Sequence, residues 1–550
     1  MRRESATVAH NVLESKERWI LLAILVLGLA LRVGLVRIDR IVRWDEPDYL
    51  ILGRNLFTGH GYTVIGKTEL HYAPLFPIAA GVLYPLTQDM KLNSDMVYVF
   101  FGVLLLVPFF WLSKELYGRR IALVATTLLC VSPPLTSGVL FWGTMLEPLY
   151  LFLLFAALAA AWYSWRERRL PGCAAMGALF GLAYLAKPEA IVNLAAILAW
   201  LTVAHALRRM LLTRHALAGL ALALAGFALV IAPYLTFMYR HTGSIMITGK
   251  LGVTYVAGQG AVEHDPGLYD RALSRLDAAG DEIIWFSADR FKYDIAELIT
   301  ADPGAFLWRI WQNVNILERV LFARQVFPFY LLALVGLGWF GASWNRGRAI
   351  KELFLMAAAL PVVIFLPFHI ELRYFAPMLP ILLLWVAKGI DAFASWLQQT
   401  WDATLPGASK ARVGTVAALG LTVLVAALFL VMQPSVIADG LEGLNPSRRD
   451  AGLWLNVHSD PGALIMSRDT EVPFFAERRW AATPNEDYER FIAYVRKRGA
   501  QYVVVDEREV TVIRPQLSFL ADPSSTPPEL KHAYTAQDRR GNTIVYEVLP

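Results

Sequence analysis

The sequence predicts a polytopic α-helical membrane protein of about eleven spans, followed by a small C-terminal α/β domain. Of its 550 residues, 56% are hydrophobic and only 18% are charged, and the mean hydropathy is +0.45. The charged residues cluster between long apolar runs, a pattern typical of helical membrane proteins. The net charge of +5 comes mainly from short loops between those runs. Membrane topology therefore explains it better than nucleic-acid binding does.

Each predicted span rests on an apolar run that approaches the length of about 20 residues needed to cross a bilayer. The runs cover residues 19–36, 97–112, 121–140, 148–165, 172–186, 190–206, 216–238, 328–344, 353–368, 375–393 and 413–432. The first run follows a basic segment and no small-residue cleavage pattern comes after it, so we expect an uncleaved helix with a cytoplasmic N-terminus. Cys130 and Cys173 both lie in apolar runs, which indicates neither a disulfide framework nor a metal cluster.

The segment 74–86 is apolar but short, and Pro74, Pro77 and Pro85 interrupt it. If it does not cross the membrane, the basic loops at 114–120, 166–169, 208–214, 346–351 and 410–412 all fall on the cytoplasmic side, as the positive-inside rule requires. If it crosses, those loops violate the rule. We therefore expect a re-entrant or interfacial segment, with its broken backbone covered by protein or lining a cavity.

This topology places the largest soluble parts of the chain on one side of the membrane. They are the first extracytoplasmic loop (37–96) and the long loop (239–327) within a membrane domain of residues 1–433, and a soluble domain of residues 434–550. In the soluble domain we expect helices at 450–457 and 486–498, strands at 463–467 and 501–506, and a hairpin of 533–537 with 543–548. In the long loop, residues 303–324 have the pattern of an amphipathic interfacial helix. We therefore expect a multi-pass membrane protein with a cytoplasmic N-terminus and an extracytoplasmic C-terminal domain.

Polar residues that can carry chemistry fall on this same predicted face. Asp45 and Glu46 follow the first span and stand beside the proline-interrupted segment, which suggests a substrate that is half lipid and half water-soluble. Group transfer from a phosphate to a hydroxyl needs a base and cations that stabilise the leaving phosphate. The acidic candidates are Asp45, Glu46 and Glu147, and the candidates for binding substrate are Lys67, His71, Tyr72, Lys187, Arg373 and Tyr374.

Structural explanations exist for several of these residues. Glu147 precedes Pro148 and would suit a helix N-terminus electrostatically. Lys187 has the position of a lysine that extends from a helix end toward the membrane surface. Arg373 has Glu371 as a nearby partner. Each explanation serves one loop only, whereas a shared site accounts for all of them.

The order of these motifs resembles the GT-C superfamily of polyprenyl-phosphate-sugar-dependent glycosyltransferases, in particular bacterial relatives of protein O-mannosyltransferases and the aminoarabinose transferase of lipid A. The matching pieces are Asp45-Glu46, the stretch from His71 to Pro77, Ser132-Pro133, Glu147, the turn from Leu185 to Pro188, and Arg373-Tyr374 ahead of Pro377 and Pro380. The resemblance covers about the first 400 residues, which is most of the predicted membrane domain.

The resemblance implies a role for several residues. Asp45 takes the position of the catalytic carboxylate with Glu46 beside it, and Glu147 that of the second-loop acidic residue, which is often Asp in relatives. Lys187 is associated with the lipid phosphate, and Arg373 and Tyr374 would line the same cavity. The Trp-Trp-Asp signature of oligosaccharide transferases and the β-trefoil insert of eukaryotic O-mannosyltransferases are absent from the sequence. N-glycosylation of protein is therefore not expected, and the acceptor need not be a protein.

These observations support an inverting glycosyltransferase that moves a monosaccharide from a polyprenyl-phosphate donor to an acceptor hydroxyl. Its partners would be the lipid-linked sugar, the bilayer and a lipid, glycan or protein acceptor. Lysine and arginine can neutralise a monophosphate, so we expect no required cofactor and no obligatory metal. A transporter or lipid flippase would carry ionisable groups at mid-membrane, whereas this chain places nearly all of them at span ends. A non-catalytic membrane scaffold would leave Asp45-Glu46 and Lys187 without a purpose.

Overall fold

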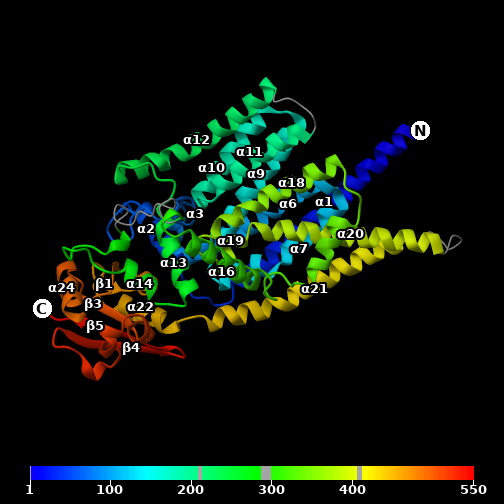
Figure 1. The fold of residues 1–550 in the computed structure, drawn as a ribbon. Coiled ribbons are helices and arrows are strands. Elements are labelled where there is room, and N and C mark those ends of the chain that lie inside the picture. The colour runs from blue at the N-terminus through cyan, green and yellow to red at the C-terminus, as the bar shows by residue number, and fades with distance from the viewer. Residues whose placement is uncertain (1, 208–212, 287–298, 405–411) are drawn as a thin grey trace.

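The computed structural model describes residues 2–207, 213–286, 299–404 and 412–550. A large helical body makes up most of the molecule, and a small sheet domain lies at one of its ends (Figure 1). The N-terminal end of α1 (Arg2–Val36) projects at the opposite end of the body, beside the outer turns of α20 (Met378–Thr404) and α21 (Val413–Glu442). This arrangement confirms the predicted fold class.

The helical body and the sheet domain have the following elements. The body contains α2 (Glu46–Phe57), α3 (Leu75–Gly81), α4 (Tyr84–Thr87), α5 (Met90–Leu104), α6 (Leu106–Tyr117), α7 (Arg119–Val131), η1 (Pro133–Leu135), α8 (Ser137–Phe141), α9 (Glu147–Glu167), α10 (Leu170–Ala186), α11 (Ala190–Leu207), α12 (Arg214–Thr242), α13 (Leu251–Glu263), α14 (Leu268–Leu273), η2 (Ile284–Phe286), α16 (Pro303–Leu321), α17 (Leu331–Phe340), α18 (Arg346–Ala359), η3 (Leu360–Phe365) and α19 (Leu372–Phe375), besides α1, α20 and α21. The sheet domain contains α22 (Pro446–His458), β1 (Leu464–Ser467), α23 (Glu471–Ala476), β2 (Arg479–Ala482), α24 (Tyr488–Arg498), β3 (Tyr502–Asp506), η4 (Glu509–Ile513), η5 (Pro515–Ala521), η6 (Pro523–Ser525), β4 (Leu530–Asp538) and β5 (Gly541–Val548).

The protein is a multi-pass membrane protein. Within the described residues, six stretches are long and apolar enough to cross a bilayer by length and composition: Lys16–Val36, Met90–Tyr117, Glu147–Glu167, Arg214–Thr242, Met378–Thr404 and Val413–Glu442. Shorter apolar helices occur at Leu75–Thr87, Leu170–Ala186, Ala190–His205 and Leu331–Phe340. Several of the eleven predicted runs therefore correspond to shorter helices.

Two predicted spans are interrupted, and in both the interruption falls at proline. The run 121–140 divides into α7, η1 and α8, because Pro133 and Pro134 have no amide hydrogen to continue an α-helix. The run 353–368 changes from α18 to the 3-10 helix η3 at Leu360-Pro361. Each of these two runs is therefore built from consecutive shorter helices.

The proline-containing segment 74–86 forms the short helices α3 and α4, as its broken pattern predicts. It packs closely on α2: a methyl group on Gly53 would lie 2.5 Å from the carbonyl oxygen of Pro77, and one on Gly81 would lie 2.6 Å from that of Gly53. Only glycine permits this approach of two backbones. Protein therefore covers one side of the segment, and its depth in a bilayer stays a prediction.

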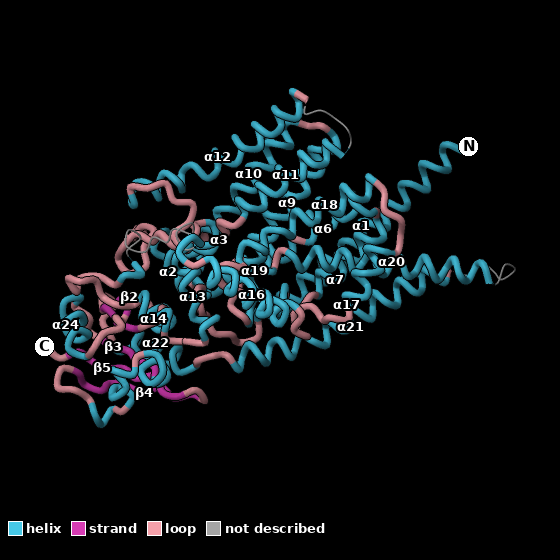
Figure 2. The backbone as a smooth tube through the Cα atoms, viewed as in Figure 1, coloured by secondary structure: helices cyan, strands magenta, loops and turns pink. Residues whose placement is uncertain are grey.

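Small residues also allow close helix packing in the rest of the body. Between α10 and α12, a methyl group on Gly177 would lie 1.9 Å from the carbonyl oxygen of Ala223, and one on Gly226 would lie 2.4 Å from that of Ala174. Such small-residue contacts let membrane helices gain dispersion energy where the hydrophobic effect does not drive association. The two helices lie side by side in both ribbon views (Figures 1 and 2).

The predicted amphipathic helix in the long loop is α16. Its apolar residues Leu307, Trp308 and Trp311 are exposed, whereas Arg309 and Asn313 are buried. The Asn313 side chain donates a hydrogen bond of 2.6 Å to the carbonyl oxygen of Leu366, just after η3. This distribution is the reverse of that in a water-soluble helix, and it fits a helix whose outer face contacts lipid.

The described residues of the C-terminal domain form one five-stranded sheet in the order β2-β1-β3-β5-β4 (Figure 2). Strands β2, β1 and β3 are parallel, and β5 is antiparallel to both β3 and β4. The strands and helices predicted for this domain are confirmed, but β2 was not predicted. Two of its four residues are alanines, which occur less often in strands than β-branched and aromatic residues do. The predicted domain boundary at residue 433 lies inside α21, which runs on to Glu442.

A buried ion pair joins this domain to the long loop. Nε and Nη2 of Arg514, which follows η4, donate to the two carboxylate oxygens of Asp270 in α14 at 2.8 and 3.0 Å. The side chains are 1% and 2% exposed. Arg468 adds a third hydrogen bond to Asp270, of 3.0 Å. Because a bidentate pair fixes orientation as well as distance, this contact sets how the domain sits on the loop.

Replacing Asp270 with alanine should destabilise this junction strongly. Loss of one partner of a buried ion pair typically costs about 3–5 kcal/mol because it leaves the other charge uncompensated. We expect the apparent melting temperature of the detergent-solubilised protein to fall by at least about 5 °C. Arg271→Ala is the matched control, since Arg271 is exposed and pairs at the surface with Asp265. Equal melting temperatures for the two variants would contradict the role of Asp270.

Candidate active site

Asp45 lies at the N-terminus of α2, where three distant segments meet. Its Oδ2 accepts a hydrogen bond of 2.8 Å from Nη1 of Arg373 and one of 3.2 Å from Nζ of Lys250. The Asp45 side chain is one quarter exposed. The preceding residue, Trp44, has a φ of +57°, which is unusual for a residue other than glycine. This turn aims the Asp45 carboxylate toward the arginine and the lysine.

The charges around Asp45 keep it ionised. Burial by itself would raise its pKa, but the positive charges of Lys250 and Arg373 outweigh burial and hold the pKa well below its usual range. Arg373 also contacts Glu371, whose pKa falls to about 2 because the Arg373 and His369 interactions outweigh desolvation by burial. Both carboxylates are therefore anionic at neutral pH and share the charge of one guanidinium.

Glu46 has a different place from its neighbour. Its two carboxylate oxygens accept hydrogen bonds of 2.8 and 2.9 Å from Arg40, and Oε1 accepts a further one of 2.7 Å from Ser94. Arg40 also binds Asp95 at 2.7 Å. Glu46 is 2% exposed. Glu46 is thus held in a buried cluster that links α2 to α5, and its part in catalysis stays a prediction.

Lys187 and Glu147 form a second ion pair at the edge of the same site. Nζ of Lys187 lies 3.1 Å from Oε1 of Glu147 and 3.0 Å from Oε1 of Glu189. It also donates a weak hydrogen bond of 3.5 Å to the backbone oxygen of Arg373. The ring of Tyr374 lies 5.6 Å from the ammonium group. Lys187 thus links the start of α9 and the end of α10 to the segment around Arg373. The carboxylates of Glu147 and Glu189 both pair with its ammonium group.

His71 and Tyr72 also reach the site, but Lys67 does not. The Tyr72 hydroxyl donates to Asp48 at 3.3 Å, and its ring lies 3.9 Å from Nζ of Lys250. Nδ1 of His71 lies 3.0 Å from Glu69. Lys67 instead pairs with Glu282 at the surface and is absent from the walls of both cavities at the site. The prediction that Lys67 binds substrate is not supported by this position.

Two cavities meet at Asp45. One, of about 330 Å³, runs from Lys187 and Glu147 to Arg373 and has apolar walls that include Ile191, Val192, Ile247, Ile364, Phe365 and Phe368. The other, of about 920 Å³, lies between α2 and the sheet domain and has many charged side chains. Asp45, His71, Lys250, Thr254, Arg373 and Tyr374 line both. An apolar and a polar compartment therefore share a wall that carries one carboxylate and two strong cations.

Lys250 is the residue of this group that sequence reasoning missed. It stands in the long loop, one residue before α13, in a stretch with no recognisable motif. A single lysine in a loop of this length gives no signal that separates it from other basic loop residues. Among the described residues, no group of three or more histidine, cysteine, aspartate or glutamate side chains is placed to hold a metal ion.

Comparison with known proteins gives one family match and several similar folds. Residues 72–232 match the family described as dolichyl-phosphate-mannose-protein mannosyltransferase. The fold is similar to the archaeal oligosaccharyltransferase AglB from Archaeoglobus fulgidus, in complex with an inhibitory peptide and a dolichol-phosphate, with a TM-score of 0.59, 14% identity, and coverage of 96% of this chain and 74% of AglB. It is also similar to ArnT from Cupriavidus metallidurans bound to undecaprenyl phosphate, with a TM-score of 0.58, 13% identity and coverage of 96% and 98%.

A third similar structure is the arabinofuranosyltransferase AftD from Mycobacteria, with a TM-score of 0.51, 13% identity, and coverage of 97% of this chain and 40% of AftD. No curated protein sequence matches the chain. The chain has the GT-C fold. The fold and the match of residues 72–232 both agree with the resemblance of its motifs to the GT-C superfamily.

The ion pairs of Glu371 should stabilise the protein in a pH-dependent way. Because its folded pKa is depressed to about 2, the stabilisation is present above the unfolded value of about 4.3 and is lost as the pH falls toward 2. We expect Glu371→Gln to lower the apparent melting temperature at pH 6 and to have a progressively smaller effect below pH 4.

Exposed Glu263 provides the matched control, since its carboxylate only accepts a hydrogen bond from Gln259. Glu263→Gln should leave the melting temperature unchanged at both pH values. A Glu371→Gln effect that is the same at pH 6 and pH 3 would show that the ion pairs of Glu371 do not contribute in this way.

Proposed function

We propose that the protein is an inverting glycosyltransferase that moves one sugar from a polyprenyl-phosphate donor to an acceptor hydroxyl. The observation that carries this proposal is the position of Asp45 at the junction of an apolar and a polar cavity, in contact with Arg373 and Lys250. Such a junction suits a donor that is apolar at one end and charged at the reacting end. We place the prenyl chain in the apolar cavity and the acceptor in the polar one.

In the proposed reaction Asp45 takes the proton of the acceptor hydroxyl. The acceptor oxygen forms a bond to the anomeric carbon while the bond from that carbon to the phosphate oxygen breaks, which inverts the configuration. The prenyl phosphate leaves with the bonding electron pair. Arg373 and Lys250 stabilise the charge that develops on it. The positions of these residues on one wall support this division of roles.

The same cations explain how Asp45 can serve as a base although its pKa is depressed. A donor phosphate beside Arg373 and Lys250 would share their charge and weaken their hold on Asp45. The pKa of Asp45 would then rise toward its usual value, which makes it a stronger base when the donor is bound.

We assign the main phosphate contact to Arg373 and Lys250, because both contact Asp45. Lys187 pairs with Glu147 and Glu189 instead and stands at the edge of the site. Because Arg373 and Lys250 can together balance a monophosphate, we propose a reaction with no obligatory metal. We also propose that the site faces the extracytoplasmic side of a bacterial inner membrane and that the N-terminus is cytoplasmic, since the basic short loops then lie in the cytoplasm.

Asp45→Asn should abolish transfer while the protein stays folded. General-base catalysis typically contributes about 10²–10⁴-fold to a rate, so we expect at least a hundredfold loss. The measurement is release of undecaprenyl phosphate from undecaprenyl-phosphate-linked mannose, galactose and arabinose by native membranes, in the presence of EDTA. Asp39→Asn is the control, because Asp39 is an exposed carboxylate in the same loop. Full activity of Asp45→Asn would remove Asp45 from the mechanism.

Lys250→Met should weaken donor binding more than Lys187→Met does. Loss of a charge-assisted hydrogen bond costs about 1.5–3 kcal/mol, which corresponds to an increase of about ten- to a hundredfold in the dissociation constant of undecaprenyl phosphate. Lys187→Met should raise it by less than about threefold, since Lys187 is already neutralised. The dissociation constants come from titration of purified protein with undecaprenyl phosphate. A larger increase in Lys187→Met than in Lys250→Met would instead assign the main phosphate contact to Lys187.

A further inference from the structure

The polar cavity next to Asp45 has features that identify the kind of acceptor it receives, an inference that rests on the function proposed above. The cavity of about 920 Å³ is at the upper end of the sizes common for ligand pockets. The sheet domain forms a large part of its wall. Arg468 and Asp469 follow β1, Thr483 follows β2, and Asp506 ends β3.

These wall residues all stand at the carboxyl ends of parallel strands. In the order β2-β1-β3, the chain runs from β1 to β2 on one side of β1 and then crosses to β3 on the other side of β1. This reversal is a topological switch point, and open α/β sheets bind ligands in the crevice outside the carboxyl ends of strands at such points. The domain therefore presents its usual ligand-binding edge to Asp45.

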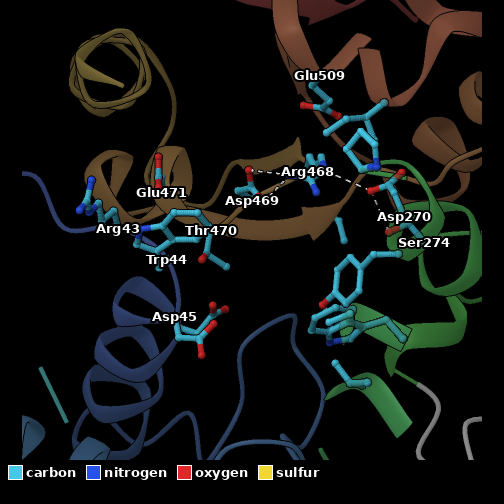
Figure 3. A pocket seen from close by; sticks show the side chains of 18 of the residues that line it. Arg43, Trp44, Asp45, Asp270, Ser274, Arg468, Asp469, Thr470, Glu471 and Glu509 are labelled. Atoms are coloured by element: carbon cyan, nitrogen blue, oxygen red, sulfur yellow. Dashed lines mark hydrogen bonds and ion pairs between the residues drawn. The ribbon is translucent and has the colours of Figure 1, made fainter. Parts of the chain in front are cut away.

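The charges of the cavity favour an uncharged ligand. Its walls carry seven lysine or arginine residues and ten aspartate or glutamate residues. The main arginines are already paired: Arg448 binds Asp469 at 2.8 Å and Asp506 at 3.1 Å. Arg468 binds Asp270 at 3.0 Å (Figure 3). An anionic acceptor would meet a net negative wall with few free cations. A neutral ligand with many hydroxyl groups would instead meet hydrogen-bonding groups held in fixed positions.

Trp44 adds an aromatic surface directly beside the proposed base. Its side chain is 68% exposed, and it lines the cavity next to Asp45 and Thr470 (Figure 3). The indole edge rests on Gly143, where a methyl group would lie 2.8 Å from Cδ1 of Trp44. Thr470 and Glu471 of the sheet domain line the same cavity as Trp44. The left-handed conformation of Trp44 presents a large apolar ring to this polar cavity.

We propose that this cavity binds a neutral saccharide as the acceptor, with one sugar ring stacked on the indole of Trp44 and its hydroxyl directed to Asp45. One face of a sugar ring carries C–H groups and packs against the negative face of an aromatic ring, while the hydroxyl groups at its rim hydrogen-bond to charged side chains. A peptide acceptor has no such flat apolar face. The walls that face Trp44 provide the paired carboxylates and guanidinium groups that the hydroxyl groups need.

The test measures binding of acceptors without turnover. Purified protein is titrated with neutral mannan, galactan, arabinan and glucan oligosaccharides, with a bisphosphorylated glucosamine disaccharide, and with a peptide rich in serine and threonine, and binding is followed by saturation-transfer NMR. Each neutral oligosaccharide is also presented as a glycolipid in bicelles, which separates a free glycan from a lipid headgroup. We expect at least one neutral saccharide to bind and the phosphorylated disaccharide and the peptide not to bind.

Variants connect this binding to Trp44. Trp44→Ala should weaken saccharide binding by about tenfold or more, and Trp44→Phe should keep it within about threefold because the aromatic face remains. The control Trp308→Ala removes an equally exposed tryptophan from α16 and should change nothing. Preferential binding of the peptide or the phosphorylated disaccharide, failure of every neutral saccharide, or unchanged binding by Trp44→Ala would overturn the proposal.

Donor binding is measured on the same preparations with undecaprenyl phosphate. It should be unchanged in Trp44→Ala, which also shows that this variant folds. If the wild-type protein binds undecaprenyl phosphate but no neutral saccharide, the acceptor proposal alone fails. If it does not bind undecaprenyl phosphate, the proposed function fails first.

Discussion

The contact between Asp45 and Arg373 is the interaction on which the site depends, because it joins residues 328 positions apart in the chain. Lys250 completes it from a third segment. Each of these side chains is partly shielded from water, so each would be unfavourable without the others. These ion pairs therefore hold together the turn before α2, the long loop and the segment before α20. The Asp45 carboxylate then faces both cavities.

The neighbouring carboxylates of Asp45 and Glu46 point in different directions because α2 begins between them. Asp45 precedes α2 and points to the cavities, whereas Glu46 is the first helical residue and turns toward Arg40 and Ser94. Consecutive residues of a helix point in directions about 100° apart. One carboxylate can therefore anchor the helix to α5 while the other remains available for a substrate.

The sheet domain completes the site and is more than an appended module. Asp270 and Arg514 fix it to the long loop, and Thr470 and Glu471 line the polar cavity with Trp44. Arg43 contacts backbone oxygens of Phe141 and Gly440, which ties the loop before α2 to α8 and the end of α21. These contacts tie the walls of the polar cavity together. Polar groups held in place around the reacting atoms are what preorganised stabilisation of a transition state requires.

The sequence by itself determined the membrane class, most of the elements of the sheet domain, and the acidic and basic residues that carry the GT-C resemblance. These features depend on local hydrophobic period, on proline and on short motifs, which can be recognised without knowing distant contacts. It placed Asp45, Glu147, Lys187 and Arg373 in one site. It could not show that Asp45 and Glu46 have different surroundings, that Lys67 lies away from both cavities, or that Lys250 contacts Asp45. Those distinctions depend on which side chains neutralise one another across the fold. Only the tertiary structure decides that, because the energy of an ion pair is set by distance and burial and not by position in the chain.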